Sequence, residues 1–338
     1  MIRPVIAACA LLAFPAVASA QKPEKKPLNE PAKEDIAALD KESAVLAPLT
    51  HANLAVFPVV STAKALKDVD YLVLDEGMKN GHVKIVEKGD GGDVNQLELR
   101  NTSDLPLFLM AGEVVIGGKQ DRIIGKNTIV APRTSESVPV FCVEHGRWSG
   151  RKAEFSTAQA LAHTELRKKA SFGDQGEVWG EVSAKNAKRK LPNATDTYRG
   201  VTQDKSVVKS IEGYDKEIRR GLAAVASKDR MIGFVVALDG KVVAIETFGS
   251  PTLFRKFQDK LLRSYFVEAV DHTFDAARPP AAPSATAISG FAEKARKAKR
   301  SVVLDKKSGK TVQFDEADVK GSEVEAADGA QVYQGAYE

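Results

Sequence analysis

Residues 112–148 constrain the fold more than any other stretch of the chain, because short β-type runs alternate there with glycines and polar groups. The stretch reads GEVVIGGKQDRIIGKNTIVAPRTSESVPVFCVEHGRW. Valine and isoleucine favour strands, and glycine beside polar residues favours the turns between them. We therefore expect several short strands of one sheet. The candidate site residues in this stretch are Glu113, Lys119, Gln120, Arg122, Glu144, Arg147 and Trp148.

The rest of the chain combines further strand patterns with amphipathic helices. Apolar or alternating runs predict strands at 54–61, 71–74, 83–88 and 94–101. The run 231–249 predicts a hairpin that turns at Asp239-Gly240. Apolar residues at helical spacing predict helices at 156–169, 175–190, 207–226 and 252–270. We expect an α+β fold, in which the helices pack on a mixed, mostly antiparallel sheet or half-barrel.

The helix expected at 252–270 has two contrasting faces. Phe257 and Leu261 fall on an apolar face, whereas Lys256 and Lys260 fall on a charged one. This division is typical of an amphipathic helix that covers a sheet and turns its charged side to solvent.

The first twenty residues have the pattern of a secretory signal peptide. Arg3 gives a short positive start, an apolar run follows, and Val17-Ala18-Ser19-Ala20 is a small-residue cleavage pattern. The run is too short to span a bilayer, which takes about 20 residues. We expect a periplasmic or secreted protein with no transmembrane segment after signal removal. Residues 21–47 are rich in Pro, Lys and Glu, which predicts a flexible leader.

Beyond the leader, we expect one main α+β domain over residues 48–275. Residues 276–290 read AARPPAAPSATAISG, which predicts a Pro/Ala-rich loop. Residues 291–338 contain two further strand pairs, with turns at Lys307-Ser308-Gly309 and at Asp328-Gly329. We expect these C-terminal strands to dock on the main domain.

Cysteine usage and charge limit the classes of function. Cys9 falls within the signal, so Cys142 alone remains and cannot form an internal disulfide. Signal removal takes away one arginine and changes the formal net charge from 49 − 45 = +4 to 48 − 45 = +3. No basic stripe is interleaved with aromatic residues, so we expect no nucleic-acid partner.

Cys142 itself has two interpretations. It lies in the apolar run PVFCV, where a free cysteine usually acts as a small buried hydrophobe. A catalytic thiolate would need partial exposure and a basic neighbour such as His145 or Arg147. Strand alternation, however, places residues 142 and 145 on opposite faces. Cys142-x-x-His145 is half of a zinc pattern, but the other histidines lack suitable spacing, so we expect no metal.

The glycine-rich turn and the two carboxylates also have two interpretations each. Gly117-Gly118-Lys119-Gln120 lacks the spacing of a nucleotide-binding loop, so no cofactor is expected. It is either a plain turn or a place where the backbone approaches an anion, with Lys119 and Arg122 supplying charge. Glu113 and Glu144 belong either to an ion-pair network with the nearby basic residues or to a polar cleft.

Four sequence blocks together resemble a bacterial family. They are GEVVIGGKQDR, VPVFCVEHGRW, IGFVVALDGKVVAIETFGSPTLFRKFQDKLLRSY and AQVYQGAYE. The combination resembles the ADP-ribosylglycohydrolase- and rhodanese-phosphatase-associated domain family over most of residues 50–275, and again at the C-terminus. The resemblance implies an α+β domain and carries over no activity. The enzymes that give the family its name act on ADP-ribose and phosphate, which points to nucleotide-derived ligands.

Three functions follow as hypotheses. The first is binding or turnover of an anionic or nucleotide-like small molecule at the candidate residues of 113–148. The second is a non-enzymatic envelope module that binds protein partners through sheet edges and tails. The third is a cysteine-dependent hydrolase that uses Cys142.

The position of the charged residues separates the first two hypotheses. Buried bridges among Lys119, Arg122, Glu144 and Arg147, with no cleft beside them, would favour the interaction module. We further predict that GEVVIGGKQDR and VPVFCVEHGRW lie on neighbouring strands of one sheet. Glu113 or Lys119 would then reach Glu144 or Arg147, because a buried charge beside apolar runs requires a partner.

Overall fold

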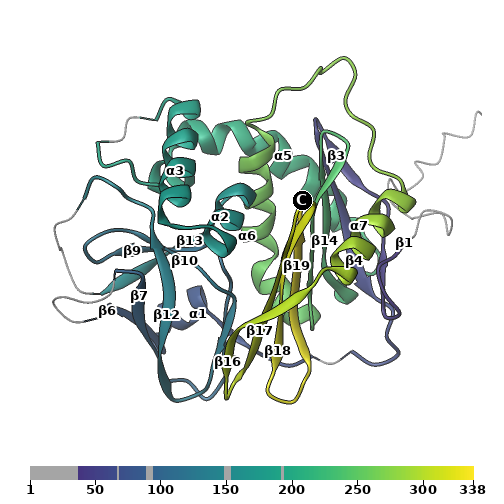
Figure 1. Cartoon of the computed structure of the whole chain (residues 1–338). Coiled ribbons are helices and arrows are strands. Elements are labelled where there is room, and N and C mark those ends of the chain that lie inside the picture. Colours follow the sequence, from purple (N-terminus) through teal and green to yellow (C-terminus); the bar gives the residue numbers. More distant parts are fainter. Residues whose placement is uncertain (1–36, 67, 89–93, 148–153, 192–193) are drawn as a thin grey trace, which may run out of the picture.

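The computed structural model describes residues 37–338 except 67, 89–93, 148–153 and 192–193. Within this part of the chain, the strands form three sheets, and the helices pack between and around them (Figure 1). The predicted signal peptide, residues 1–20, lies outside the described residues.

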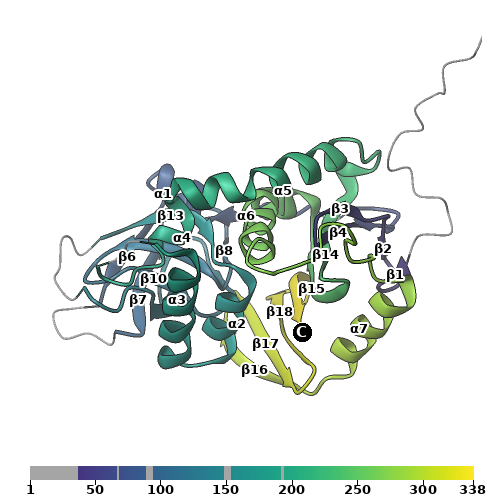
Figure 2. The same cartoon turned by 90° about the horizontal axis from the view of Figure 1, so that it is seen from above.

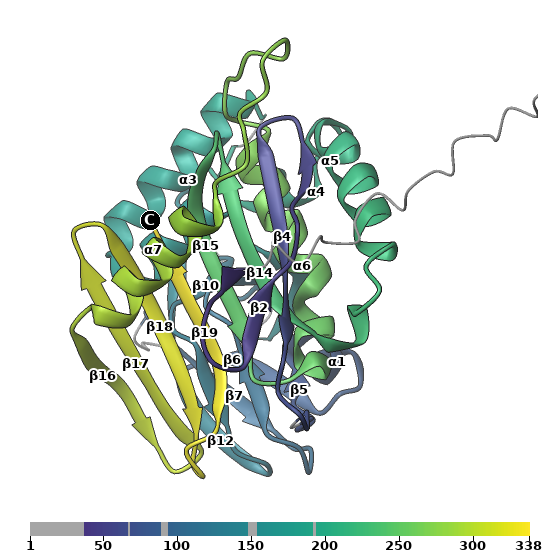
Figure 3. The same cartoon turned by 90° about the vertical axis from the view of Figure 1, so that its right-hand side faces the viewer.

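The largest sheet has ten strands, which all pair antiparallel. Their order is β1 (Ala37–Ala38), β2 (Ser43–Val45), β4 (Leu54–Ser61), β14 (Met231–Leu238), β15 (Lys241–Phe248), β19 (Gln331–Tyr337), β18 (Val319–Ala326), β17 (Gly309–Glu316) and β16 (Arg300–Lys306), and β3 (Leu49–His51) pairs with β4. The predicted hairpin is β14–β15: Asp239 and Gly240 both have positive φ, as a type I′ turn requires. The C-terminal strands continue this sheet (Figure 3).

The second sheet curls into a half-barrel. Its order is β13 (Phe155–Leu161), β9 (Glu113–Gly117), β10 (Arg122–Ile124), β12 (Thr134–Cys142), β7 (Gln96–Asn101) and β6 (Val83–Glu87). A bridge between Val86 and Glu154 joins its two edges. The third sheet contains β11 (Thr128–Val130), β8 (Leu107–Leu109) and β5 (Leu72–Val73), and β5 pairs parallel with β8. Both small sheets share one apolar core, which includes Leu99, Leu109, Val115, Ile124 and Val140.

The helices connect and cover these sheets. They are α1 (Leu74–Lys79), α2 (Thr164–Phe172), α3 (Gln175–Arg189), α4 (Arg199–Gln203), α5 (Lys205–Ala223), α6 (Pro251–Ala269) and α7 (Ala285–Lys297). Figure 2 shows α6 between the half-barrel and the large sheet, with α5 beside it and α7 against the opposite face of the large sheet. The Ser250 hydroxyl caps α6 by accepting from the Leu253 N–H at 3.1 Å. Among the described helices, none is long and apolar enough to cross a membrane.

The predicted fold class is confirmed. The chain is α+β and mostly antiparallel, one of its sheets is a half-barrel, and helices pack on the sheets. The helices predicted at 175–190, 207–226 and 252–270 correspond to α3, α5 and α6, with bounds that agree within a few residues.

The helix predicted at 156–169 is wrong over its first half. Residues 155–161 form β13, and helix α2 begins only at Thr164. Ser156 and Thr157 pair with Ile116 and Val115 of β9, so the strand gains the backbone hydrogen bonds that a local helix would otherwise supply. The tertiary pairing therefore overrides the helical propensity of the sequence STAQAL.

Two predicted boundaries also need correction. Within the predicted leader, residues 37–38 and 43–45 form β1 and β2, because Ala37 and Val45 bury their side chains in the apolar cluster between the large sheet and α7. The predicted Pro/Ala-rich loop ends early: α7 begins at Ala285, and the Ser284 hydroxyl caps it by accepting from the Ala287 N–H.

Candidate functional site

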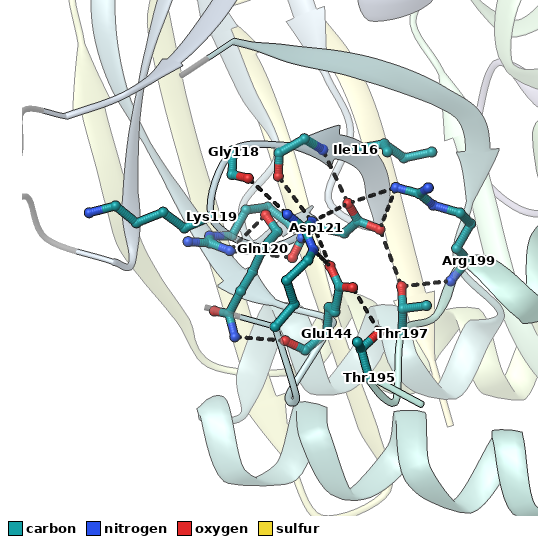
Figure 4. Close-up of polar contacts among 12 residues, drawn as sticks. Ile116, Gly118, Lys119, Gln120, Asp121, Glu144, Thr195, Thr197 and Arg199 are labelled. Atoms are coloured by element: carbon teal, nitrogen blue, oxygen red, sulfur yellow. Dashed lines mark hydrogen bonds and ion pairs between the residues drawn. The ribbon is translucent and has the colours of Figure 1, made fainter. Parts of the chain in front are cut away.

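The two polar sequence blocks lie in one sheet, as predicted, but β9 of the first block is not the direct neighbour of β12, because β10 lies between them and only Arg122 of that block is on β10. Val115 of β9 is opposite Arg122 of β10, and Arg122 is in turn opposite Cys142 of β12. The polar turns that follow β9 and β12 therefore meet at one end of the half-barrel, where they face the loop before α4 (Figure 4).

Two carboxylates and two guanidinium groups form a compact network there, which we call the polar brace: Asp121, Glu144, Arg147 and Arg199. The Arg147 Nε donates to Glu144 Oε2 at 2.8 Å, and its Nη2 donates to Asp121 Oδ1 at 3.1 Å. The Arg199 Nη2 lies 3.1 Å from both oxygens of Asp121. The formal charges of the brace cancel.

Backbone groups and threonines complete the brace. The Thr195 hydroxyl donates to Glu144 Oε1 at 2.8 Å, and the Asp121 N–H donates to Glu144 Oε2 at 3.2 Å. Burial alone would raise the pKa of Glu144, but the hydrogen bonds from Arg147, Thr195 and the Asp121 N–H hold it below the usual range. All four carboxylate oxygens of the brace accept hydrogen bonds from the chain itself.

The other predicted site residues lie around the brace rather than in it. The Gln120 Nε2 donates to the Glu144 carbonyl at 2.7 Å, and the Lys119 N–H donates to Glu87 Oε1 at 3.0 Å. Trp148 lies outside the described residues.

Glu113 belongs to a different cluster from the one predicted. It is buried, and its Oε1 lies 2.6 Å from the Nζ of Lys260 on α6. The same Nζ lies 2.9 Å from Asp75 Oδ2. We predicted that Glu113 or Lys119 would reach Glu144 or Arg147. The Glu113 contact is wrong, because α6 brings its own cation to this face of β9. Asp121, which the sequence analysis did not single out, makes the link to Arg147 instead.

A family model settles what kind of domain this is. The model of the ARG and Rhodanese-Phosphatase-superfamily-associated Protein domain matches residues 42–337. The chain belongs to this family. No curated protein and no solved structure matches it. The family domain extends through the C-terminal strands β16–β19, so it includes the whole ten-stranded sheet except β1, together with the half-barrel and the brace.

Two predicted residues of the family domain, Gln120 and Arg122, have buried side-chain atoms without a hydrogen-bond partner in the described part of the chain, and Arg122 has two of them. The Arg122 side chain is fully buried, and its Nη1 donates to the Gln120 carbonyl at 2.8 Å. Its Nη2 lies 3.6 Å from Glu87 Oε1, which is an ion pair but too long for a hydrogen bond. Within the described residues, Nε and Nη2 have no hydrogen-bond acceptor.

The surroundings of Cys142 in the family domain disfavour a reactive thiolate. It is 2% exposed, and burial raises the pKa of its thiol, whereas a nucleophilic cysteine needs a lowered pKa and access to solvent. The Gln175 side chain also holds its backbone, accepting from the N–H at 2.8 Å and donating to the carbonyl at 2.9 Å. His145 packs edge-on against Trp179. The described residues contain no cluster that could hold a metal ion.

Three cavities of the family domain lie away from the brace. Their volumes are about 330, 670 and 410 Å³, and no residue of 112–147 lines any of the three. Glu144 and Arg147 are paired in mostly buried bridges, and Arg122 is paired with Glu87. The ion pairs of the brace and the Glu144–Thr197 bridge join the half-barrel to α4 and the loop before it.

Proposed function

We propose that the chain is an exported interaction module that binds an extended segment of a partner protein along β16. One observation carries the proposal: β16 is the last strand of the ten-stranded sheet, and it exposes adjacent valines. Val302 is 57% exposed and Val303 is 37% exposed. A terminal strand presents unpaired N–H and C=O groups, which an added strand can satisfy.

The ends of β16 indicate the chemistry of the partner. Its two basic residues are already engaged, since Arg300 pairs with Glu323 and Lys306 pairs with Glu136, whereas Asp305 is exposed. Lys299 and Lys307, which flank the strand, are both exposed. An extended segment with alternating apolar residues and an acidic residue at each end would complement this edge.

The pairing of the charged groups within the polar brace supports the same function. Its carboxylate oxygens all accept hydrogen bonds from the chain, so the charged groups of the brace are used to hold the fold together. Export rests on the signal-peptide pattern of residues 1–20, and the native protein should then begin at Gln21, which N-terminal sequencing checks.

Fluorescence anisotropy with labelled peptides tests the docking edge. We expect the peptide EVTVTVE to bind the protein and KVTVTVK to bind it at least about tenfold more weakly, because like charges then meet at both ends. The double variant Val302→Lys/Val303→Lys should lose binding of EVTVTVE. The matched control is Val208→Lys on α5, where the valine is 38% exposed. Equal binding by the double variant and the control would refute the proposal.

A second candidate function is the binding of a small oxyanion by Arg122. The unused Nε and Nη2 form the side of a guanidinium that binds carboxylate or phosphate with two parallel hydrogen bonds. A buried polar group without a partner costs roughly 1–3 kcal/mol, which a bound anion would recover. Because Arg122 is fully buried, the turn beside it would have to open to admit the anion.

Thermal shift measurements test this second candidate. Phosphate and ADP-ribose should stabilise the wild type beyond NaCl at the same ionic strength, and should have no such effect on Arg122→Met. If neither anion raises the melting temperature of the wild type, Nε and Nη2 of Arg122 do not bind these anions, and the second candidate function is wrong.

A further inference from the structure

The largest of the three cavities, about 670 Å³, lies at the end of the large sheet where α6 begins. Its floor is apolar and includes Phe248, Leu253 and Val332, which are all buried. Its volume falls in the range of small-molecule sites, roughly 300–1,000 Å³. We call it the acidic cavity because its rim carries four carboxylates: Asp40, Glu42, Asp68 and Asp328.

The charge of this rim is not neutralised by the described residues of the cavity lining. Among the described residues that line it there is no Lys, Arg or His. All four acids are exposed, and within the described part of the chain none of them takes part in an ion pair. The rim is therefore a concentrated negative patch on a chain whose net charge is +4.

Asp68 illustrates how the chain keeps this charge in place. It accepts hydrogen bonds from the Thr252 hydroxyl at 2.6 Å and the Thr252 N–H at 3.2 Å. The hydroxyl bond in particular holds the pKa of Asp68 below its usual range. The first turn of α6 thus fixes a charged carboxylate at the mouth of the cavity.

Two arginines lie near the cavity without lining it. Arg255 donates to the Thr252 hydroxyl at 2.6 Å, and Arg230 donates to the Ser61 carbonyl at 2.9 Å. Both attenuate the field of the rim, but two guanidinium groups outside the lining do not cancel four carboxylates on it.

A buried hydroxyl gives an independent indication of a ligand. Ser43 lines the cavity and is 4% exposed, and its Oγ has no hydrogen-bond partner within the described residues. Across the β2–β4 pair, Ser43 is opposite Ser61, which also lines the cavity. Buried hydroxyls in folded proteins are normally hydrogen-bonded, so this oxygen is available to accept from a donor in the cavity.

We propose that the acidic cavity binds a small aliphatic diamine, with its methylene chain on the apolar floor and its ammonium groups at the rim carboxylates. A metal ion does not fit, because the described residues contain no group of three or more ligands close enough to hold one. Separated carboxylates around an apolar floor instead match separated ammonium groups on an apolar chain. This site is distinct from the docking edge at β16 and does not depend on it.

Isothermal titration calorimetry with cadaverine tests the proposal. We expect cadaverine to bind, pentylamine to bind about tenfold more weakly because it has one ammonium group, and 1,5-pentanediol not to bind. The double variant Glu42→Gln/Asp328→Asn should weaken cadaverine binding roughly tenfold, since it removes two charges from the rim. The matched control is Asp229→Asn, which removes an exposed carboxylate outside the cavity lining.

The outcomes separate the proposal from a general attraction of cations. Cadaverine binding that is weakened by the double variant and kept by Asp229→Asn supports a diamine site. Equal heats from cadaverine and pentylamine, or from wild type and double variant, would overturn it. So would a full loss of cadaverine binding in MgCl₂ at an ionic strength where the matching NaCl solution leaves it intact, because the rim would then be a metal site.

Discussion

Replacing Arg167 by methionine is expected to lower the free energy of unfolding by about 3–5 kcal/mol, the usual cost of breaking a buried ion pair from one side. Arg167 is 2% exposed, and its Nη1 donates to Glu246 Oε2 at 3.1 Å. Glu246 is fully buried, and it also accepts from the hydroxyls of Tyr265, Tyr333 and Tyr337. Burial alone would raise the pKa of Glu246, but Arg167 and the tyrosines hold it below the usual range.

Urea and thermal unfolding measure this effect. The melting temperature of Arg167→Met should fall by roughly 10 °C. The control is Arg219→Met: this side chain is 39% exposed and pairs with Asp215 and Asp259, so its loss should cost less than about 1 kcal/mol. Adding Glu246→Gln to Arg167→Met should restore part of the stability, because no buried charge is then left uncompensated. If Arg167→Met is no worse than Arg219→Met, the cluster contributes little to the fold.

Replacing Lys260 by methionine is expected to give a loss of stability that depends on pH. Lys260 lies between Glu113 and Asp75, at 2.6 and 2.9 Å, and these carboxylates keep the pKa of Lys260 above its usual value despite burial. Burial raises the pKa of Glu113, and Lys260 opposes that rise. Without Lys260 the pKa of Glu113 should rise further, because the buried carboxylate loses its nearest cation.

The sign of the pH effect follows from this shift. An acid whose pKa is higher in the folded than in the unfolded state stabilises the fold at low pH, and this stability is lost as the pH rises through the folded pKa. The deficit of Lys260→Met relative to wild type should therefore be largest near pH 8, at about 3–5 kcal/mol, and smaller near pH 5. Urea unfolding of both proteins at the two pH values measures it. Adding Glu113→Gln should remove most of the pH dependence, and a deficit that is the same at both pH values would contradict this account.

The sequence predicts which strands share a sheet better than it predicts which charges pair. Strand alternation and glycine turns are local features, and they correctly place the two polar blocks in one sheet, although β10 separates β9 from β12. The partners of those blocks come from distant helices: Lys260 from α6 and Arg199 from α4. Neither has a local signal, because a basic residue on an amphipathic helix looks like part of a solvated face.

Lys260 shows the physical reason for that limit. The helical pattern assigns it to the solvent face of α6, yet only 8% of its side chain is exposed. Helix α6 lies between two sheets, so its polar side meets the half-barrel rather than water (Figure 2). A periodicity argument assumes one covered face, and it fails when a helix is covered on both. Asp121, in contrast, lies within the polar block GEVVIGGKQDR, between the candidate residues Gln120 and Arg122. Its part in the brace could therefore have been predicted from the sequence.

The position of β19 has a consequence for how the protein is made. β15 receives its second neighbour only from residues 331–337, after the long segment that contains α6, α7 and β16–β18. While the ribosome is still producing that segment, the nascent chain has an open hydrogen-bonding edge in the middle of the future sheet. The Tyr333 and Tyr337 hydroxyls, which solvate the Glu246 carboxylate, are also absent until then. The large sheet can therefore be completed only when the whole chain is available, and holding chaperones would have a long period in which to bind the unfinished chain.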